Sequence, residues 1–178
     1  MCLKKIEEYC GDCDYWKKLY QTANYHHALF DYNDSMKHYM KVFKFEGNIK
    51  LSEVFNQEIS QFFSSCSYDL VVPIPLSKKR LKIRGFNQVE EILKASEISY
   101  TDLLMKKKHT KSQSKSSRQE RLISYHAFQV KKGKYPDIKG KKLVLVDDIY
   151  TTGSTIYQAR QVLLTAGAKE VITLTLAR

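Results

Sequence analysis

The C-terminal third of the chain carries the pattern that most narrows the possible folds. An apolar run over 142–146 predicts a buried strand, and a helix is predicted over 155–166, where Gly167 ends it. A further apolar run over 171–176 predicts a second strand. A strand, a helix and a strand within about 35 residues form a βαβ unit, whose two strands are parallel. The sequence therefore predicts an α/β domain with a mainly parallel sheet flanked by helices.

The rest of the chain adds further strand and helix signals around this unit. A helix is expected to begin at Asp34 or Ser35 and to end near Gly47. Segment 77–84 is predicted as a basic loop, and 106–118, which has no apolar side chain, as a mobile segment. The other predicted strands are 25–32, 69–75 and one near Phe128, and the other predicted helices are 51–63, 88–95 and 119–125.

The length of 178 residues allows one compact domain and a small appendage. We divide the chain into a cysteine-containing segment, 1–20, and a single domain, 21–178. No stretch reaches the roughly 20 apolar residues that span a bilayer, and no apolar signal segment is visible, so a cytoplasmic protein without a membrane span is expected.

The net charge of +11 comes from one segment of the chain. Residues 105–142 contain 13 Lys and Arg against Glu120 and Asp137, while the rest of the chain is balanced. A segment of this kind attracts polyanions such as nucleic acid, a nucleotide polyphosphate or an anionic membrane surface, and its alternative interpretation is a solvated basic loop.

Residues 147–155 are the segment of the sequence richest in candidate ligand-binding residues. They follow a predicted strand and begin a predicted helix, where free amides and a positive dipole favour anions. Gly153 and four hydroxyl side chains suit a phosphate monoester, while Asp147 and Asp148 suit sugar hydroxyls or a divalent cation. The alternative interpretation of this segment is an ordinary capped helix start whose acids are solvated and bind no ligand. A receiver domain is excluded because no Asp follows Asp148, and a P-loop enzyme because its Gly-rich Lys-Ser/Thr motif is absent.

The stretch from Leu143 to Thr155 resembles the 5-phosphoribosyl-1-pyrophosphate (PRPP) motif of type I phosphoribosyltransferases. Two further stretches are similar to the ComF family of competence proteins. The first runs from Pro73-Ile-Pro75 through Arg80 to the family motif Arg84, Gly85, Phe86, Asn87 and Gln88, and the second is Gln113, Arg121 and Ala127-Phe128. One departure is Ser124, where ComF relatives usually have Asn.

The resemblance implies a role for each matching residue. The acids Asp147 and Asp148 are expected to accept hydrogen bonds from the ribose hydroxyls and to be the catalytic residues, with Mg²⁺ bridging to the pyrophosphate. The residues expected to hold the 5-phosphate are Thr151, Thr152, Gly153, Ser154 and Thr155, and those expected at the pyrophosphate are Ser77, Lys78, Lys79 and Arg80. The residues expected in a closing lid that also meets DNA are Lys106, Lys107, Lys108, Lys111, Lys115, Arg118 and Arg121.

The same resemblance implies a role in DNA uptake during natural transformation. On this hypothesis the protein binds PRPP and single-stranded DNA in the cytosol and acts with a ComFA-like ATP-dependent DNA translocase. The alternative is an active phosphoribosyltransferase that transfers phosphoribose from PRPP to an unidentified acceptor. N-terminal aromatic side chains could stack on exposed bases, although packing in the core is their commoner use.

ComF proteins usually begin with a zinc module made of Cys-x-x-Cys pairs. Here Cys10 and Cys13 form one pair and Cys2 stands alone, so three cysteines leave a tetrahedral Zn²⁺ one ligand short. The residues considered for the fourth position are His26, His27 and Cys66. No histidine shows a spacing that demands a catalytic base.

Overall fold

The protein was examined as a computed structural model, which describes residues 26–107 and 127–178. The N-terminal segment 1–25 and the stretch 108–126, with the helix predicted at 119–125, lie outside the described residues. In the described part no helix has both the length and the apolar character needed to cross a bilayer.

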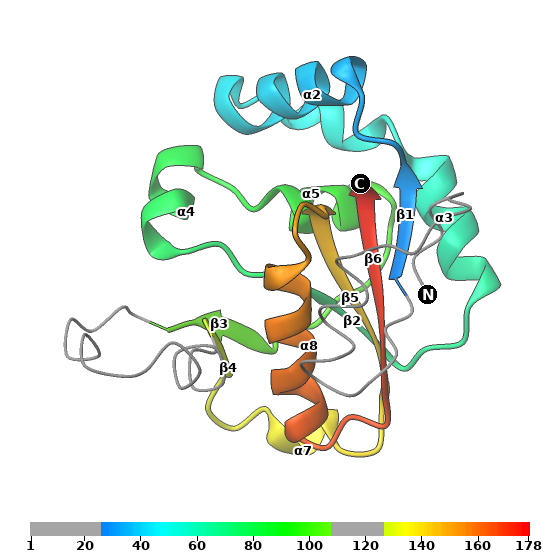
Figure 1. The fold of residues 1–178 in the computed structure, drawn as a ribbon, viewed down its shortest axis with the longest axis vertical. Helices are drawn as coiled ribbons and strands as arrows, with labels where there is room; N and C mark the ends of the chain where they lie inside the picture. Colours follow the sequence, from blue (N-terminus) through cyan, green and yellow to red (C-terminus); the bar gives the residue numbers. More distant parts are fainter. Residues whose placement is uncertain (1–25, 108–126) are drawn as a thin grey trace.

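A four-stranded parallel sheet forms the centre of the fold (Figure 1). Its strand order is β1 (His26–Phe30), β6 (Glu170–Ala177), β5 (Lys142–Ile149) and β2 (Leu70–Pro73). All three pairings are parallel, and α8 (Ser154–Thr165) connects β5 to β6. The predicted α/β class, the mainly parallel sheet and the βαβ unit are confirmed.

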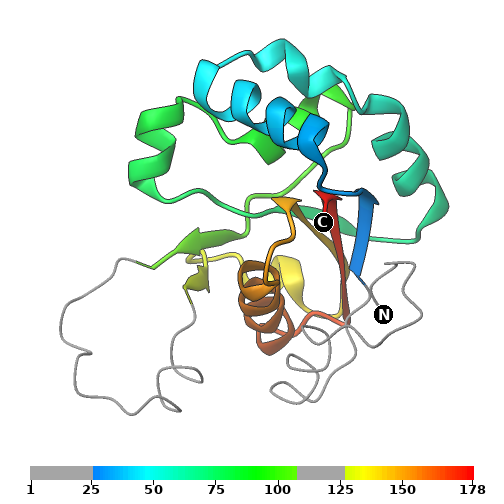
Figure 2. The same ribbon diagram turned by 45° about the horizontal axis from the view of Figure 1, so that its top comes forward.

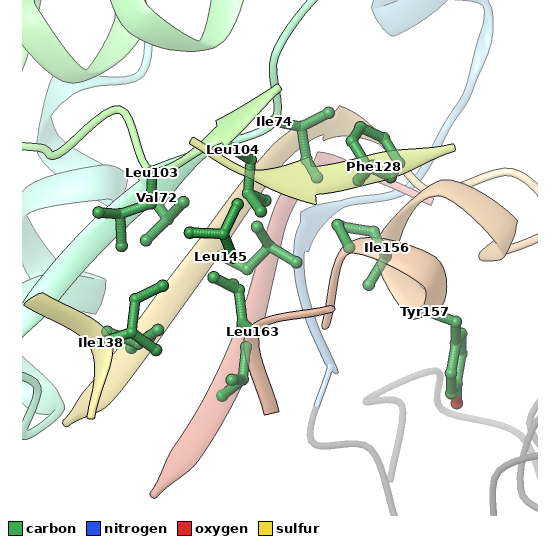
Figure 3. Packing of buried hydrophobic residues seen from close by; sticks show 14 of the residues in the cluster. Val72, Ile74, Leu103, Leu104, Phe128, Ile138, Leu145, Ile156, Tyr157 and Leu163 are labelled. Atoms are coloured by element: carbon green, nitrogen blue, oxygen red, sulfur yellow. The ribbon is translucent and has the colours of Figure 1, made fainter. Parts of the chain in front are cut away.

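Strand β5 is buried on both faces, because its side chains alternate between two cores. Leu143 and Leu145 belong to the first core. Figure 3 shows Leu145 in this core with Ile156 and Leu163 of α8. Val144 and Val146 belong to the second core. The second core also holds residues of α2 (Asp34–Lys41), α3 (Asn56–Ser65) and α5 (Gln88–Ala95).

The helix predicted from Asp34 or Ser35 to Gly47 is present, but its cap is Asn33. The Asn33 side chain accepts a hydrogen bond from the Met36 amide at 2.9 Å, and α2 then continues into a π-helical turn, η1 (Val42–Glu46). Gly47 ends this turn with a φ of 70°.

The helix predicted at 51–63 is instead two elements. A 3-10 helix, η2 (Ile49–Glu53), precedes α3, and the backbone breaks between them at Val54 and Phe55. The Phe55 ring packs on the rings of Phe30 and Tyr39, with centroids 4.7 and 4.9 Å away. Aromatic packing fixes Phe55 at the break, which helical periodicity alone does not reveal.

The basic segment predicted as a loop is a short helix, α4 (Lys78–Arg84). Ser77 caps it by accepting from the Arg80 amide at 3.2 Å, and Gly85 ends it with a φ of 80°. Figures 1 and 2 show α4 projecting away from the sheet. The sequence pattern indicates a loop because α4 buries none of its residues and so has no core-facing apolar side.

A second, antiparallel sheet pairs β3 (Leu104–Lys106) with β4 (Phe128–Val130), and a short helix, α7 (Tyr135–Ile138), follows. The strand predicted near Phe128 is confirmed, whereas β3 is absent from the sequence prediction. Lys106 therefore ends a strand, opposite Phe128, instead of beginning a mobile segment. The Lys107 amide extends the pairing by donating to the Ala127 carbonyl at 2.9 Å.

Candidate functional site

The carboxyl ends of β5 and β2 lie next to each other, because these strands are parallel neighbours. The pairing continues just beyond β2, where the Ile74 amide donates to the Val146 carbonyl at 2.8 Å. The chain leaving β5 leads to α8 and the chain leaving β2 leads to α4. Two of the predicted ligand-binding segments thus begin at one edge of the sheet, where α/β folds usually bind ligands.

Asp147 and Asp148 belong to β5 itself, which runs to Ile149 rather than ending at Val146. Successive strand residues leave the backbone on opposite faces, so one ligand reaches both carboxylates only from the end of the strand. The Asp147 carboxylate accepts a hydrogen bond from the Asp148 amide at 2.9 Å. Burial and the neighbouring charge of Asp148 raise the pKa of Asp147 to about 7.

Three cations act on this acid pair. Lys44 Nζ of η1 lies 2.6 Å from Asp148 Oδ2. Lys106 interacts electrostatically with both acids and with Arg80, and Arg84 interacts with Asp148. Burial and the Arg80 charge lower the pKa of Lys106, whose Nζ lies 5.3 Å from the centroid of the Phe128 ring. Negative charge at the acids is therefore balanced from both faces of the sheet.

Lys44 is a site residue that the sequence does not predict. It stands between Phe43 and Phe45 in a segment whose sequence pattern indicates only a helix. Its neighbour Asp148 is about a hundred positions away along the chain, so local sequence carries no signal for the ion pair.

The threonine-rich turn after β5 is open to solvent. Thr151, Thr152 and Thr155 are exposed, and Gly153 adopts a left-handed conformation with a φ of 76° at the start of α8. Gly153 brings no capping side chain, and the Ser154 amide at the start of α8 makes a long hydrogen bond of 3.5 Å to the Thr152 hydroxyl. The Ser154 hydroxyl accepts a hydrogen bond from Gln158 Nε2 at 2.9 Å. Exposed hydroxyls and helix amides together can hold an anion.

Tyr150, the residue before this turn, attaches the turn to strand β6. Its amide donates to the Ala177 carbonyl at 2.9 Å. Its buried ring packs on His26, with centroids 4.3 Å apart, and on Arg178, whose guanidinium carbon lies 4.4 Å from the ring centroid. The His26 ring nitrogens lie 3.0 and 3.2 Å from the hydroxyls of Thr173 and Thr175. Burial, chiefly, lowers the pKa of His26 to about 3, so this ring is neutral.

The predicted pyrophosphate residues surround the start of α4. Ser77 is its cap, and Lys78, Lys79 and Arg80 form its exposed first turn. The Arg80 charge opposes the charged forms of Lys106 and Arg84, so Arg80 lies near two of the cations that act on the acid pair. Lys78 and Lys79 project into solvent and contribute charge to the surroundings.

The motif from Arg84 to Gln88 is the corner that joins α4 to α5. Arg84 Nη1 donates to the Gln88 side chain at 2.8 Å, and Asn87 caps α5 by accepting from the Val89 amide. The Asn87 side chain also donates to the carbonyl of Ile74, the residue after β2. Phe86 packs on Phe43 with ring centroids 5.6 Å apart. The corner holds the Arg84 guanidinium near Asp148.

The remaining predicted residues lie mostly outside the described part of the chain. These are the lid and DNA residues Lys108, Lys111, Lys115, Arg118 and Arg121 and the zinc candidates Cys2, Cys10 and Cys13. Of the residues considered as a fourth zinc ligand, His26 has both ring nitrogens against threonine hydroxyls. Cys66 has a free thiol whose pKa burial raises, and His27 lies against the Phe62 ring. Within 26–107 and 127–178 no three His, Cys, Asp or Glu side chains form a metal cluster.

The acid pair can be tested against the Mg²⁺ ion that the phosphoribosyltransferase resemblance implies. Mg²⁺ retains several waters and is usually held by one or two carboxylates together with substrate phosphates. Asp147 and Asp148 supply two carboxylates, and Lys44 already contacts the second of them. The residues present fit a Mg²⁺ ion that a polyphosphate carries in, and they do not fit a free ion held by the protein alone.

Comparison with known structures places the fold. The structure of the allosteric regulatory enzyme of purine biosynthesis matches 87% of this chain at a TM-score of 0.52 and 19% identity. The glutamine PRPP amidotransferase of B. subtilis, complexed with ADP and GMP, matches 87% at a TM-score of 0.54 and 18% identity. The chain spans about a third of the length of these proteins, 31% and 32%, and the likeness shows the fold alone.

Sequence comparison places the family. Residues 81–178 match the phosphoribosyl transferase domain. The competence protein ComFC of Streptococcus pneumoniae is 40% identical over 99% of this chain and 79% of its own length. The competence protein ComFC of Bacillus subtilis is 33% identical over 98% of this chain and 74% of its own length. The chain therefore belongs to the family of ComFC competence proteins and carries a phosphoribosyl transferase domain.

Proposed function

We propose that this protein acts in the cytosol during DNA uptake in natural transformation, where it binds PRPP and single-stranded DNA and works with a ComFA-like translocase. The observation that carries the proposal is the meeting of two acids, three cations and an exposed threonine-rich turn at one edge of the sheet. A phosphoribosyl ligand has hydroxyls and phosphates at separate ends, which matches this separation of acids from anion-binding groups. Membership of the ComFC family supports the role in competence.

The ribose and its 5-phosphate would lie along the end of β5 and the start of α8. Asp147 and Asp148 would accept hydrogen bonds from the two ring hydroxyls. The exposed hydroxyls of Thr151, Thr152 and Thr155 and the first-turn amides of α8 would donate to the phosphate. The positive end of the α8 dipole further favours the dianion.

The pyrophosphate would face the cations rather than the α8 turn. Arg80, Arg84 and Lys106 interact electrostatically with one another or with the acids, so they can meet a polyphosphate carried on the same ligand. Mg²⁺ bound to that polyphosphate would supply additional charge neutralisation.

An enzymatic role is the second candidate, favoured by the match to the phosphoribosyl transferase domain. Transfer of phosphoribose would release pyrophosphate and pass through a ribosyl centre with positive character. Asp147 and Asp148 would stabilise that centre through the hydroxyls that they hold. The test is pyrophosphate release from PRPP and Mg²⁺ with nucleobases, amines and nucleic acids as acceptors, and a complete absence of release contradicts catalysis.

The double variant Asp147→Ala, Asp148→Ala tests the PRPP site. It should abolish PRPP binding in a calorimetric titration. Binding of single-stranded DNA should stay intact or become stronger, because the variant removes two negative charges from a cationic surface. The double variant Asp31→Ala, Glu53→Ala removes two exposed acids and is the charge-matched control. Equal PRPP affinity in the site variant and the parent would refute the proposed site.

Binding of single-stranded DNA is tested by its salt dependence. Oligonucleotides of about 10 to 20 bases should bind with a log–log salt slope near 0.7 per phosphate contacted. Binding that is insensitive to salt, or no binding, contradicts the DNA role while leaving the PRPP site untouched.

A further inference from the structure

The ion pair between Lys44 and Asp148 joins η1 to the carboxyl end of β5. The side chains retain only 12% and 16% of their exposure, and the charged atoms lie 2.6 Å apart. Salt screens a pair so withdrawn from water much less than it screens a surface pair. The contact is therefore a lasting part of the site and not a transient surface interaction.

The local fold holds Lys44 in this position. Phe43, the residue before it, is fully buried in the second core and packs on Tyr39 and Phe86. The π-helical turn that contains Lys44 runs directly into the left-handed Gly47. A buried aromatic side chain next to the lysine and a fixed end to the turn leave the ammonium little freedom to move away from Asp148.

Lysines reach the acid pair from both faces of the sheet. Lys44 comes from an element of the second core and Lys106 from β3, whose residue Leu104 lies in the first core. Both lysines also act electrostatically on Asp147 and oppose the effects of burial and of Asp148. The two lysines thus offset part of the negative charge of the acid pair within the chain.

Lys44 Nζ occupies one of the carboxylate oxygens that a divalent cation would use, and its charge repels a cation in a site of low dielectric. We propose that Lys44 is an internal counter-ion that closes the Asp147–Asp148 pair to free divalent cations and reserves it for ligands that donate hydrogen bonds from hydroxyl groups. Lys44 is then a specificity-determining residue. A sugar hydroxyl approaches a lysine-paired carboxylate without charge repulsion, whereas a free Mg²⁺ or Mn²⁺ meets an ammonium at the same oxygen.

The test is calorimetric titration of the full chain with MnCl₂ alone. Lys44→Gln should bind Mn²⁺ at least about tenfold more tightly than the parent, because the substitution removes a positive charge that repels the cation from an acid pair in a site of low dielectric. Lys44→Arg keeps the charge and should bind as weakly as the parent. Lys41→Gln removes an exposed lysine from α2 and is the matched control. The variant Lys44→Gln, Asp148→Asn should lose the gain.

Mn²⁺ binding by Lys44→Gln no tighter than by the parent would overturn the proposal. Equal tightening in Lys44→Arg would also overturn it, because shape rather than charge would then open the site. A second measurement needs no variant: millimolar Mn²⁺ should leave the amide NMR signals of Asp148 and Tyr150 in the parent sharp, and selective broadening there would refute the closure. No phosphoribosyl ligand is used, so the outcome is independent of the proposed function.

Discussion

The two helices that begin at the ligand edge, α8 and α4, start in opposite ways. Gly153 opens α8 without a capping side chain, and the Ser154 amide makes only a long contact of 3.5 Å with the Thr152 hydroxyl, whereas Ser77 caps α4 with its own hydroxyl at 3.2 Å. Helix α8 has 12 residues, of which Ile156, Tyr157, Ala159, Arg160 and Leu163 are buried, and α4 has seven, none of them buried.

This difference assigns the two helices different parts in binding. An anchored helix that begins at a glycine offers directed amide hydrogen bonds and a dipole at a fixed place. A short, self-capped helix without buried residues offers mainly the charges on its side chains, which act over distance and are screened by salt. We therefore expect α8 to determine whether a phosphate binds and α4 to tune how strongly.

The largest effect is expected from Gly153→Val. A branched side chain at a φ of 76° costs roughly 1–2 kcal/mol of stability, and it adds methyl groups beside the amides at which the phosphate is proposed to bind. PRPP affinity, measured by calorimetry, should fall at least about a hundredfold.

The control is Gly133→Val, because Gly133 has a φ of 82° and a Cβ added there would have open space within 4 Å. This variant shares the backbone strain and should keep the parent affinity. Unchanged binding in Gly153→Val would remove the distinction between the two helices.

The second prediction concerns the support beneath the α8 turn. His26 is neutral in the fold with a pKa of about 3, whereas its unfolded value is 6.5, so the unfolded chain binds the extra proton between these values. Stability should therefore fall as the pH falls below about 6.5, by roughly 2 kcal/mol between pH 7 and pH 5. Urea unfolding of the parent and of His26→Asn at both pH values isolates the contribution. An identical pH dependence in both proteins would contradict it.

The third prediction tests the charge on α4. Lys79→Gln with Arg80→Gln should weaken PRPP binding about tenfold at low salt, and the difference should shrink as salt is added. Lys132→Gln, an exposed lysine after β4, is the control. A loss as large as that of Gly153→Val, and independent of salt, would mean that α4 provides directed contacts.

The smallest effect is expected from Ser77→Ala. Loss of the cap should lower the local stability of α4 by about 1 kcal/mol, with less than about a threefold change in PRPP affinity. Amide hydrogen exchange at Leu81 and Gly85, which donate to the carbonyls of Ser77 and Leu81, reports this local opening. Faster exchange across the central sheet would show instead that α4 and the domain core unfold together.

Sequence reasoning is most successful where one element carries its own signal. The apolar run before Asp147, the helix ended by Gly167 and the final apolar strand are local patterns, and they predict the parallel core. The pattern nevertheless ends the strand at Val146, because acids are poor strand formers. Pairing with β6 continues through Asp147 to Ile149 and overrides that preference.

Features that depend on distant partners escape such reasoning. Nothing near Lys44 in the sequence indicates Asp148, and the short strand containing Lys106 exists because Phe128 lies opposite it. The break at Phe55 likewise depends on rings from β1 and α2. The positions of individual site residues follow from these long-range contacts, which spacing along a single chain does not encode.

Strand β5 separates the two cores and contributes side chains to both, with Leu143 and Leu145 on one face and Val144 and Val146 on the other. Asp147 and Asp148 at the end of β5 are positioned by this strand, so a packing defect in either core is expected to displace them. Substitutions that damage either core should then have the same consequence, a protein that still folds but has lost the proposed phosphoribosyl binding.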